Sequence, residues 1–310
     1  MKKTICSLIV LAATMMVALA GGKKEVTDNY SYTVASPSGA PGVAVAMLAV
    51  ENQESYTFLA AETITAEFSK AQSDFVIAPI NAGAKLYAMG KSTYKLGAVV
   101  TWGNLYFASQ KEGFSLDDIN GAVITLFGEK TINASIARFV LEKNGIVPAD
   151  IAYLGSAANT QNLLLTDPTA IVLTAEPALS AAQMKNKGIT AYSVNDLYKK
   201  ATGFDGFTQA GLFVREKTIT EHPAVVAQFL HDVSDSIEKC SSDTEAVADA
   251  VVALEILPNK KVALSAIPRC SIAFMSAKKA KKQVEKTALI DVEQYGGVVP
   301  AADFYYDGQR

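Results

Sequence analysis

The sequence predicts an α/β fold of two lobes, each a β-sheet flanked by helices, with two extended crossings of the chain between them. The chain has 310 residues and half of them are apolar, which is enough to fill two hydrophobic cores. Short apolar runs typical of buried strands alternate with segments of helical periodicity. Residues 30–90 and 121–186 repeat the same order of strands, loops and helices without repeating a sequence motif, which indicates two lobes of similar topology.

In the first repeat, each strand leads through a loop of small residues into a helix. Strands are expected at residues 32–35, 56–60 and 74–79, and helices at residues 43–50, 63–71 and 81–89. The loop at 36–42 is rich in Pro and Gly, and the helix after it would direct unpaired N–H groups beyond the sheet edge, where ligands bind. It has neither the G-x-G-x-x-G pattern nor the Lys-Ser/Thr of a P-loop, so no nucleotide site is predicted. An ordinary βα turn explains the loop equally well.

The rest of the chain completes the two lobes. Extended runs at 94–102 and 105–109 follow the first repeat, and the second of them leaves the first lobe. The second repeat has expected strands at residues 122–127, 151–154 and 170–174, and helices at residues 132–144, 157–165 and beyond residue 177. Residues 207–215 return to the first lobe, and helices are expected from residue 223 and at residues 244–254, 259–266 and 277–288, with no further strand. We assign residues 30–108 and 211–310 to lobe I and residues 109–210 to lobe II.

The first 29 residues have the features of an export signal followed by a tether. Met1-Lys2-Lys3 is basic, residues 5–20 are an apolar run too short for a comfortable membrane span, and Ala18-Leu19-Ala20 offers an A-x-A cleavage site. Residues 1–20 are therefore predicted to be a signal peptide and residues 21–29 a flexible tether. Leu19-Ala20-Gly21 also matches the start of a bacterial lipoprotein box, but Gly22 stands where the lipid-bearing Cys is required. We expect an exported protein, periplasmic or on the cell surface.

Composition argues against several functional classes. The net charge is only -3 and no polybasic segment is present, so no nucleic-acid partner is expected. The two histidines, His222 and His231, lie just past the return strand, and there is no G-x-S-x-G or H-E-x-x-H motif, so no enzyme is predicted. Cys240 and Cys270 lack metal-ligand spacing; they either pair outside the cytoplasm or remain two buried thiols. No metal and no cofactor is expected.

Four segments occur in an order that resembles a known family. They are DFVIAPINAG from residue 74, GAVITLFGEKTINASIARFVLEKNGI from residue 121, IVLTAEPA from residue 171 and GGVVPAADFYY from residue 296. With the leader, they resemble periplasmic solute-binding proteins of the type II fold, in the branch that contains binding proteins for sulfonates, nitrate and thiamine precursors. The resemblance implies a monomeric receptor that closes around a small solute by a hinge and delivers it to the membrane permease of an ABC importer.

Candidate ligand-binding residues lie in loops at the carboxyl ends of the predicted strands, which converge on one crevice in open α/β sheets. They offer hydroxyl groups, backbone N–H groups and close backbone approach. In lobe I they are Ser36, Gly39, Asn81 and Ala82, and in lobe II they are Gly128, Thr131 and Ser156. Simple turn formation is the alternative role for the lobe I residues.

Further candidates lie at the crossings. Trp102, the only tryptophan, and Tyr106 would stack on a flat ligand, although filling the core is an equally good role for Trp102. The resemblance assigns Glu176 to the family's Glu-Pro position, where it either points inward to accept hydrogen bonds or points outward as a helix N-terminal acid. The scarcity of Lys and Arg near the pocket loops argues against a doubly charged anion, unless Arg269 reaches the crevice.

The favoured function is therefore a receptor for a small polar solute, and a flat heterocycle would suit Trp102, Tyr106, Asn81 and Glu176. One alternative is an enzyme on the same fold related to pyrimidine-precursor synthesis. The pocket histidine and cysteine-rich motif of that enzyme have no match in this sequence. The other alternative is an exported surface protein without a small ligand, which would need exposed apolar patches.

Overall fold

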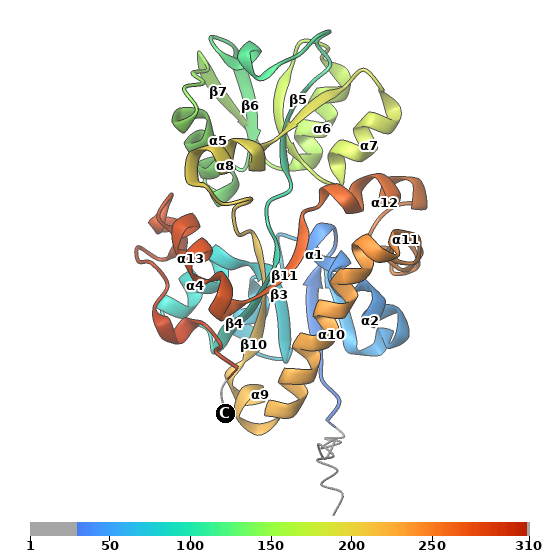
Figure 1. The fold of residues 1–310 in the computed structure, drawn as a ribbon, viewed down its shortest axis with the longest axis vertical. Helices are drawn as coiled ribbons and strands as arrows, with labels where there is room; N and C mark the ends of the chain where they lie inside the picture. The colour runs from blue at the N-terminus through green and yellow to red at the C-terminus, as the bar shows by residue number, and fades with distance from the viewer. Residues whose placement is uncertain (1–29, 309–310) are drawn as a thin grey trace, which may run out of the picture.

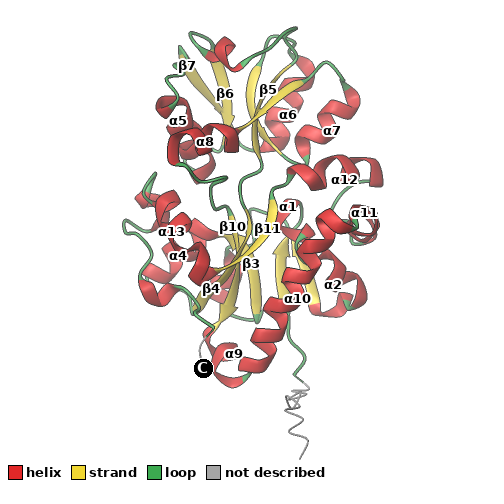
Figure 2. Ribbon diagram, viewed as in Figure 1, coloured by secondary structure: helices red, strands yellow, loops and turns green. Residues whose placement is uncertain are grey.

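Two β-sheets organise the structure, a computed structural model that describes residues 30–308. The predicted signal peptide and tether lie outside the described residues. One sheet has six strands in the order β11-β4-β10-β3-β1-β2, and the other has five in the order β7-β6-β8-β5-β9. We call the six-stranded sheet with its helices lobe I and the five-stranded sheet with its helices lobe II. The lobes lie end to end (Figure 1), and Figure 2 shows helices around each sheet. The predicted two-lobed α/β fold is confirmed.

Most of the helices belong to lobe I. Its strands are β1 (Val34–Pro37), β2 (Tyr56–Leu59), β3 (Phe75–Pro79), β4 (Tyr94–Thr101), β10 (Ala210–Arg215) and β11 (Ile272–Ser276). Its helices are α1 (Ala40–Val43), α2 (Ala46–Glu51), α3 (Ala66–Lys70), α4 (Ile80–Ala88), α9 (Glu216–Glu221), α10 (Pro223–Ser242), α11 (Thr244–Ala253), α12 (Lys260–Ala266) and α13 (Ala277–Ala288). It also contains the 3₁₀ helices η1 (Gln53–Ser55), η3 (Ile267–Arg269), η4 (Val292–Tyr295) and η5 (Ala302–Phe304).

Lobe II is formed by the middle of the chain. Its strands are β5 (Leu105–Ser109), β6 (Val123–Phe127), β7 (Asp150–Leu154), β8 (Ile171–Ala175) and β9 (Thr190–Ser193). Its helices are α5 (Ile132–Lys143), α6 (Ala157–Thr166), α7 (Ala178–Lys185) and α8 (Val194–Thr202), with the 3₁₀ helix η2 (Leu116–Ile119). Among the helices of residues 30–308, none is both long and apolar enough to span a bilayer.

The two lobes share one topology. In each, three strands pair in parallel, in the order β2-β1-β3 in lobe I and β7-β6-β8 in lobe II. In each, a strand that has just crossed from the other lobe is added antiparallel, β10 against β3 and β5 against β8. The structure thus confirms the repeated order of parts that the sequence predicts.

The chain crosses between the lobes earlier than predicted. All of β5 pairs within lobe II, from Leu105 opposite Ala175 to Ser109 opposite Ile171, so the first crossing lies at residues 102–104 and not after residue 108. The reason is packing, because the buried Ala108 belongs to a cluster of apolar side chains contributed by lobe II. The return crossing at residues 203–209 leads directly into β10.

Some short elements differ from the prediction or are missing from it. The strands β9 (TAYS) and β11 (IAFMS) are partly exposed along their length, so neither has the buried apolar run that marks a central strand. The helices α8 and α9 were also not predicted. Two helices replace the single helix predicted at residues 43–50. The first, α1, begins at Ala40, and Pro41 is favourable in its first turn; the second is α2.

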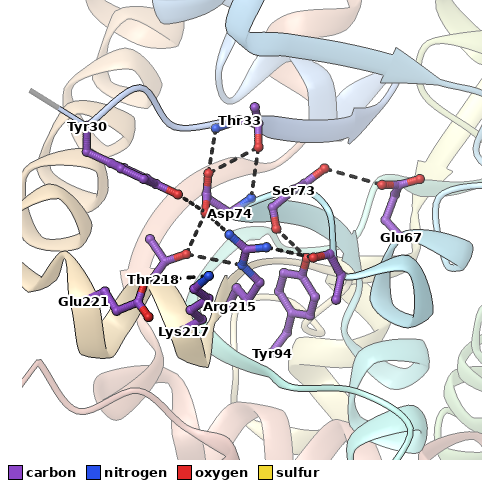
Figure 3. A network of polar contacts seen from close by, with 11 residues as sticks. Tyr30, Thr33, Glu67, Ser73, Asp74, Tyr94, Arg215, Lys217, Thr218 and Glu221 are labelled. Atoms are coloured by element: carbon purple, nitrogen blue, oxygen red, sulfur yellow. Dashed lines mark hydrogen bonds and ion pairs between the residues drawn. The ribbon is translucent and has the colours of Figure 1, made fainter.

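A buried ion pair holds the chain before β1 against lobe I, at the amino end of β3 (Figure 3). Arg215 Nη2 lies 2.5 Å from Asp74 Oδ1, and Thr218 Oγ1 donates a hydrogen bond to the same oxygen at 2.7 Å. Tyr30 Oη donates to Asp74 Oδ1 at 2.9 Å, and Thr33 N donates to Asp74 Oδ2 at 3.0 Å. One carboxylate therefore joins the chain before β1 to the start of β3, the end of β10 and helix α9.

The stabilising contribution of Asp74 should be lost at acid pH. Burial raises the pKa of Asp74, but the hydrogen bonds from Thr218, Thr33 and Tyr30 and the charge of Arg215 lower it more, so its pKa falls below the ordinary value of 3.8. Protons then bind the unfolded chain more tightly than the folded protein. The contribution is therefore complete above the unfolded pKa of about 3.9 and declines as the pH falls through the folded pKa.

Urea unfolding between pH 6 and pH 3 measures this effect. Wild type should lose more unfolding free energy across that interval than the Asp74→Asn variant, which has no carboxyl group to titrate at this position. Equal losses in the two proteins would contradict the lowered pKa.

Candidate ligand-binding cleft

A cleft of about 610 Å³ lies between the two lobes. Its lobe I wall contains the ends of β1 and β3 and the loop after β2, and its lobe II wall contains the ends of β6 and β7 with the starts of α5 and α6. Asn104, Gln209 and Ala210, in or beside the crossings, also line it. The loops at 36–42, 79–83 and 128–131 thus converge as predicted, whereas the loop at 174–177 does not line the cleft.

Local sequence positions three helix N-termini at this cleft. The chain enters α4 directly from Pro79, α5 through the turn from Gly128 to Thr131, and α6 through Ser156. Gly128 has φ +67, and a Cβ there would lie 2.8 Å from Thr131 Cγ2, so the turn requires glycine. Thr131 Oγ1 donates to the Gly128 carbonyl at 2.7 Å, and Ser156 Oγ accepts from Asn159 N at 3.3 Å. Both hydroxyls therefore have turn or cap roles, while the first-turn N–H groups give these walls partial positive charge.

The polar side chains of the cleft are mostly carboxamides, from Asn81, Asn104, Asn133, Gln209 and Gln294. Within residues 30–308, the side chains of Asn81, Gln209 and Gln294 make no hydrogen bond to the protein. Among the described lining residues, the loop after β2 supplies the one charged side chain, Glu62, and β6 supplies the one aromatic ring, Phe127. The cleft can therefore donate and accept hydrogen bonds while carrying little net charge.

Asn104 places a buried oxygen beside the cleft. The residue is 7% exposed, and its Nδ2 donates to the carbonyl oxygen of Glu176 at 2.8 Å. Because a carbonyl only accepts, this contact fixes which end of the carboxamide is nitrogen. The Oδ1 atom is then buried without a donor. Since buried polar atoms nearly always have a partner, this oxygen is suited to a donor that a ligand brings.

The structure brings half of the predicted site residues together. Asn81, Ala82, Gly128, Thr131 and Ser156 all line the cleft.

Two predicted lobe I residues lie just outside it. Ser36 is buried, and its hydroxyl donates to the carbonyl of Pro37 at 3.2 Å. Gly39, with φ +92, turns the chain into α1, and the residues on either side of it, Ser38 and Pro41, line the cleft instead. Both predicted residues shape the backbone of the loop, which was the alternative role.

The predicted aromatic wall is not formed, because both side chains bond to the lobe I backbone and neither lines the cleft. Trp102 Nε1 donates to the carbonyl of Ala273 at 2.8 Å, and the residue lines a separate pocket of about 430 Å³ with Phe204. Tyr106 Oη donates to the carbonyl of Arg269 at 2.9 Å.

Glu176 is buried in the protein and does not line the cleft. Its carboxylate accepts hydrogen bonds from Ser180 N at 3.1 Å and Ser180 Oγ at 3.0 Å, and Arg269 Nε lies 3.0 Å away. Burial raises the pKa of Glu176, while the charge of Arg269 and the hydrogen bonds from Ser180 act in the opposite direction. Glu176 thus points into the protein and not into the cleft, and the cation beside it is Arg269, which also does not line the cleft.

Sequence reasoning missed Asn104, Asn133, Gln209 and Gln294. The sequence contains a pattern that could have identified Asn104 and Gln209 as cleft residues, because each lies next to the end of a strand that borders a crossing. Asn133 lies in the first turn of α5, beside residues that were predicted. Gln294 has no local signal, because η4 comes near the end of the chain and only the fold brings it to the cleft.

The histidines and cysteines of the described residues lie outside the cleft. In the part of the chain that the structure describes, no cluster of three or more His, Cys, Asp or Glu side chains is arranged to hold a metal ion. His222 stacks on Tyr30 with ring centroids 3.7 Å apart, and His231 Nδ1 lies 3.2 Å from a carboxylate one turn along α10. Cys240 and Cys270 are two buried thiols, not a disulfide, and burial raises the pKa of Cys240 to about 12.

Comparisons with known proteins agree with this architecture. A family model described as NMT1/THI5 like matches residues 40–246. An ABC transporter structure from Parabacteroides distasonis is 21% identical, with TM-score 0.78, and the match covers 90% of this chain and 100% of that one. The periplasmic aliphatic sulphonate binding protein SsuA from Escherichia coli is 14% identical, with TM-score 0.67 and coverage of 88% and 91%.

A further structural neighbour is the alkanesulfonate-binding protein SsuA from Xanthomonas axonopodis pv. citri bound to MOPS. It is 15% identical, with TM-score 0.64 and coverage of 89% of this chain and 98% of that one. Curated protein sequences give no match. The family match spans more than half of the chain, and the structural matches span nearly all of it. The chain therefore belongs to the NMT1/THI5-like family and has the type II periplasmic-binding-protein fold.

Proposed function

We propose that the protein is an exported solute-binding receptor that captures one small, uncharged polar solute between its lobes and delivers it to an ABC importer. The cleft carries this proposal: a solute that contacts both walls would hold the two lobes around itself. The names of the structural neighbours, an ABC transporter and two sulfonate-binding proteins, support the same class. The enzyme alternative has less support, because no described residue lining the cleft is His, Cys or Lys.

The proposed absence of charge on the solute follows from the cleft residues. A sulfonate is an anion, and proteins commonly hold such groups with Arg or Lys. The described lining residues include neither, and Glu62 would repel an anion. The carboxamides offer N–H donors and oxygen acceptors to a neutral molecule instead.

Within this class we favour a flat heterocycle. The edge of such a ring can alternate donors and acceptors, as the carboxamides do. Phe127 and the proline rings of Pro37, Pro41 and Pro79 supply apolar surface for its faces. These rings take the place of the stacking role predicted for Trp102.

Export, delivery to a permease and a monomeric state belong to the same proposal. The signal peptide predicted at residues 1–20 supports export to the periplasm or the cell surface. One chain supplies both walls of the cleft, so a single copy is sufficient to enclose a solute.

The test starts with the purified protein. Small molecules released on denaturation are identified by mass spectrometry, and a library that includes neutral heterocycles and sulfonates is screened by thermal shift. A neutral heterocycle should raise the Tm, because a ligand that binds only the folded state stabilises it by about 2.7 kcal/mol at 100 times its Kd. The solute should be recovered unchanged. Chemical conversion would favour the enzyme, preferential binding of sulfonates would contradict the uncharged solute, and no stabilisation by any compound would contradict the receptor.

Replacing Asn104 with Leu should weaken binding of the solute identified by this screen by about 10–100-fold, because losing a hydrogen bond to a buried group costs about 1–3 kcal/mol. Isothermal titration calorimetry measures the Kd. Asn52→Leu is the matched control, because Asn52 is exposed and bonds only to Ser55 in its own loop. An unchanged Kd in Asn104→Leu would remove this side chain from the site.

A further inference from the structure

The lobes also touch along their flanks, away from the two crossings. On one flank, helix α12 of lobe I packs against helix α7 of lobe II (Figure 1), and Ser265 Oγ donates to Ser180 Oγ at 3.2 Å. On the flank of α5 and α13, Ser135 Oγ donates to Asp291 Oδ2 at 2.6 Å. The flank of α12 differs from the other flank because it also contains an ion pair between the two lobes.

Arg269, which ends η3 directly after α12, contacts three side chains of lobe II. Its Nε lies 3.0 Å from Glu176 Oε1, and its Nη1 donates to Gln183 Oε1 at 2.6 Å. Its guanidinium carbon lies 4.9 Å from the ring centroid of Tyr106, whose hydroxyl donates to the Arg269 carbonyl. Backbone and side chain of this one lobe I residue are thus both held by lobe II.

The Glu176 side chain is 0% exposed, so its charge depends on these partners. A buried carboxylate without a cation costs far more than an exposed one, and a buried pair is strongly destabilised when one partner is removed. The hydrogen bonds from Ser180 satisfy oxygen atoms but supply no positive charge. Arg269 therefore supplies from lobe I the charge that a lobe II carboxylate requires.

The same glutamate holds a cleft residue by its backbone. Glu176 N donates to the Asn104 carbonyl at 3.0 Å, and Asn104 Nδ2 donates to the Glu176 carbonyl at 2.8 Å. The path from the cleft to the flank is therefore short: the Asn104 carboxamide, the Glu176 backbone, the Glu176 carboxylate and the Arg269 guanidinium.

We propose that Arg269 is a positioning residue of the cleft, which connects the lobes non-covalently and fixes their relative position where Asn104 meets the cleft. This proposal rests on the proposed function in one respect: it assumes that a solute is the partner of Asn104. Because neither Arg269 nor Glu176 lines the cleft, the relative position of the lobes can be measured on the protein without added solute, independently of solute binding.

The experiment measures an interlobe distance with nitroxide spin labels and double electron–electron resonance. The labels go on K239C, on the exposed surface of α10 in lobe I, and N162C, on the exposed surface of α6 in lobe II. The variants are R269Q, E176Q/R269Q, R269K and the control K260Q. Lys260 lies on α12, but its partners Glu245 and Asp249 belong to lobe I, so K260Q removes an ion pair within one lobe.

R269Q should lower the Tm by about 5 °C or more, because it leaves Glu176 buried without a cation. E176Q/R269Q should recover most of that loss, yet show a longer mean interlobe distance or a wider distribution than wild type. R269K, which keeps the charge, should lie closer to wild type in distance than R269Q, and K260Q should match wild type.

Two results would overturn the proposal. One is an E176Q/R269Q protein that is folded and has the wild-type distance distribution, because the lobes would then keep their position without the ion pair. The other is a shift of equal size in K260Q, which would make the effect a general response to lost surface charge. If the distances change as expected and no compound stabilises the wild-type protein, the proposed receptor function fails while the connection between the lobes stands.

Discussion

Replacing Asp74 with Ala should lower the free energy of unfolding by about 3–5 kcal/mol, since breaking a buried ion pair leaves an uncompensated charge. The Arg215 side chain is 17% exposed and the Asp74 side chain 4%, so water compensates little of the lost attraction. The change also removes the acceptor of Thr33 N and Thr218 Oγ1. Because these partners belong to the chain before β1 and to α9, the chain before β1 should loosen from lobe I. Urea unfolding followed by circular dichroism measures the loss.

Asp205→Ala is the control for this prediction. Asp205 pairs with Lys199 at 2.7 Å, but the two side chains are 89% and 63% exposed, so removing this solvent-screened pair should cost far less than removing Asp74. A similar small loss in Asp74→Ala would mean that water replaces the buried contacts, and would contradict the role of Asp74.

Replacing Phe213 with Ala should lower the free energy of unfolding by about 3–5 kcal/mol, because it removes a large ring from a packed core. Phe213, on β10, is fully buried, and its ring meets the ring of Phe68 edge-on with centroids 4.9 Å apart. It also covers Gly83 of α4, where a Cβ would lie 2.4 Å from the Phe213 ring. Truncation would therefore leave a cavity between β10 and the helices α3 and α4.

Gly83→Ala gives an internal control for that packing. Alone, it should destabilise by about 1–3 kcal/mol, because the new methyl group overlaps the Phe213 ring. In Gly83→Ala/Phe213→Ala the methyl group occupies space left by the ring, so the combined loss should be smaller than the sum of the two single losses. Additive losses in urea unfolding would contradict the contact.

The parts of the fold that the sequence predicts are those set by local patterns. The strand β3 is a continuous buried apolar run that leads into a helix, and β8 has the same character, so the repeated core of each lobe could be predicted. The strand β11 could not, because it is partly exposed and exists through pairing with β4, where Ile272 lies opposite Thr101. The boundary at β5 was misplaced because no local pattern states which sheet a strand will join.

The same division holds for the cleft. Asn81, Gly128 and Ser156 could be predicted because loops at the carboxyl ends of strands converge in this kind of fold, which is a rule about local order. The orientations of Trp102 and Glu176 could not, because they depend on partners far along the chain, Ala273 and Arg269. Residue type suggested a ligand contact for Trp102 and the family resemblance suggested one for Glu176, whereas tertiary pairing gave each a protein partner.

Because Trp102 is the only tryptophan and lies between the lobes, its fluorescence can report on their relative position. The Trp102 indole is bonded to Ala273 of lobe I, while its backbone carbonyl accepts from Asn195 Nδ2 of lobe II at 2.8 Å, so the chromophore lies where the chain bends between the lobes. The side chain is half-buried, and a rotation of the lobes would change its hydration and hence its emission maximum. With excitation selective for tryptophan, stopped-flow fluorescence would therefore time the binding of an unlabelled compound, with no second tryptophan contributing to the signal.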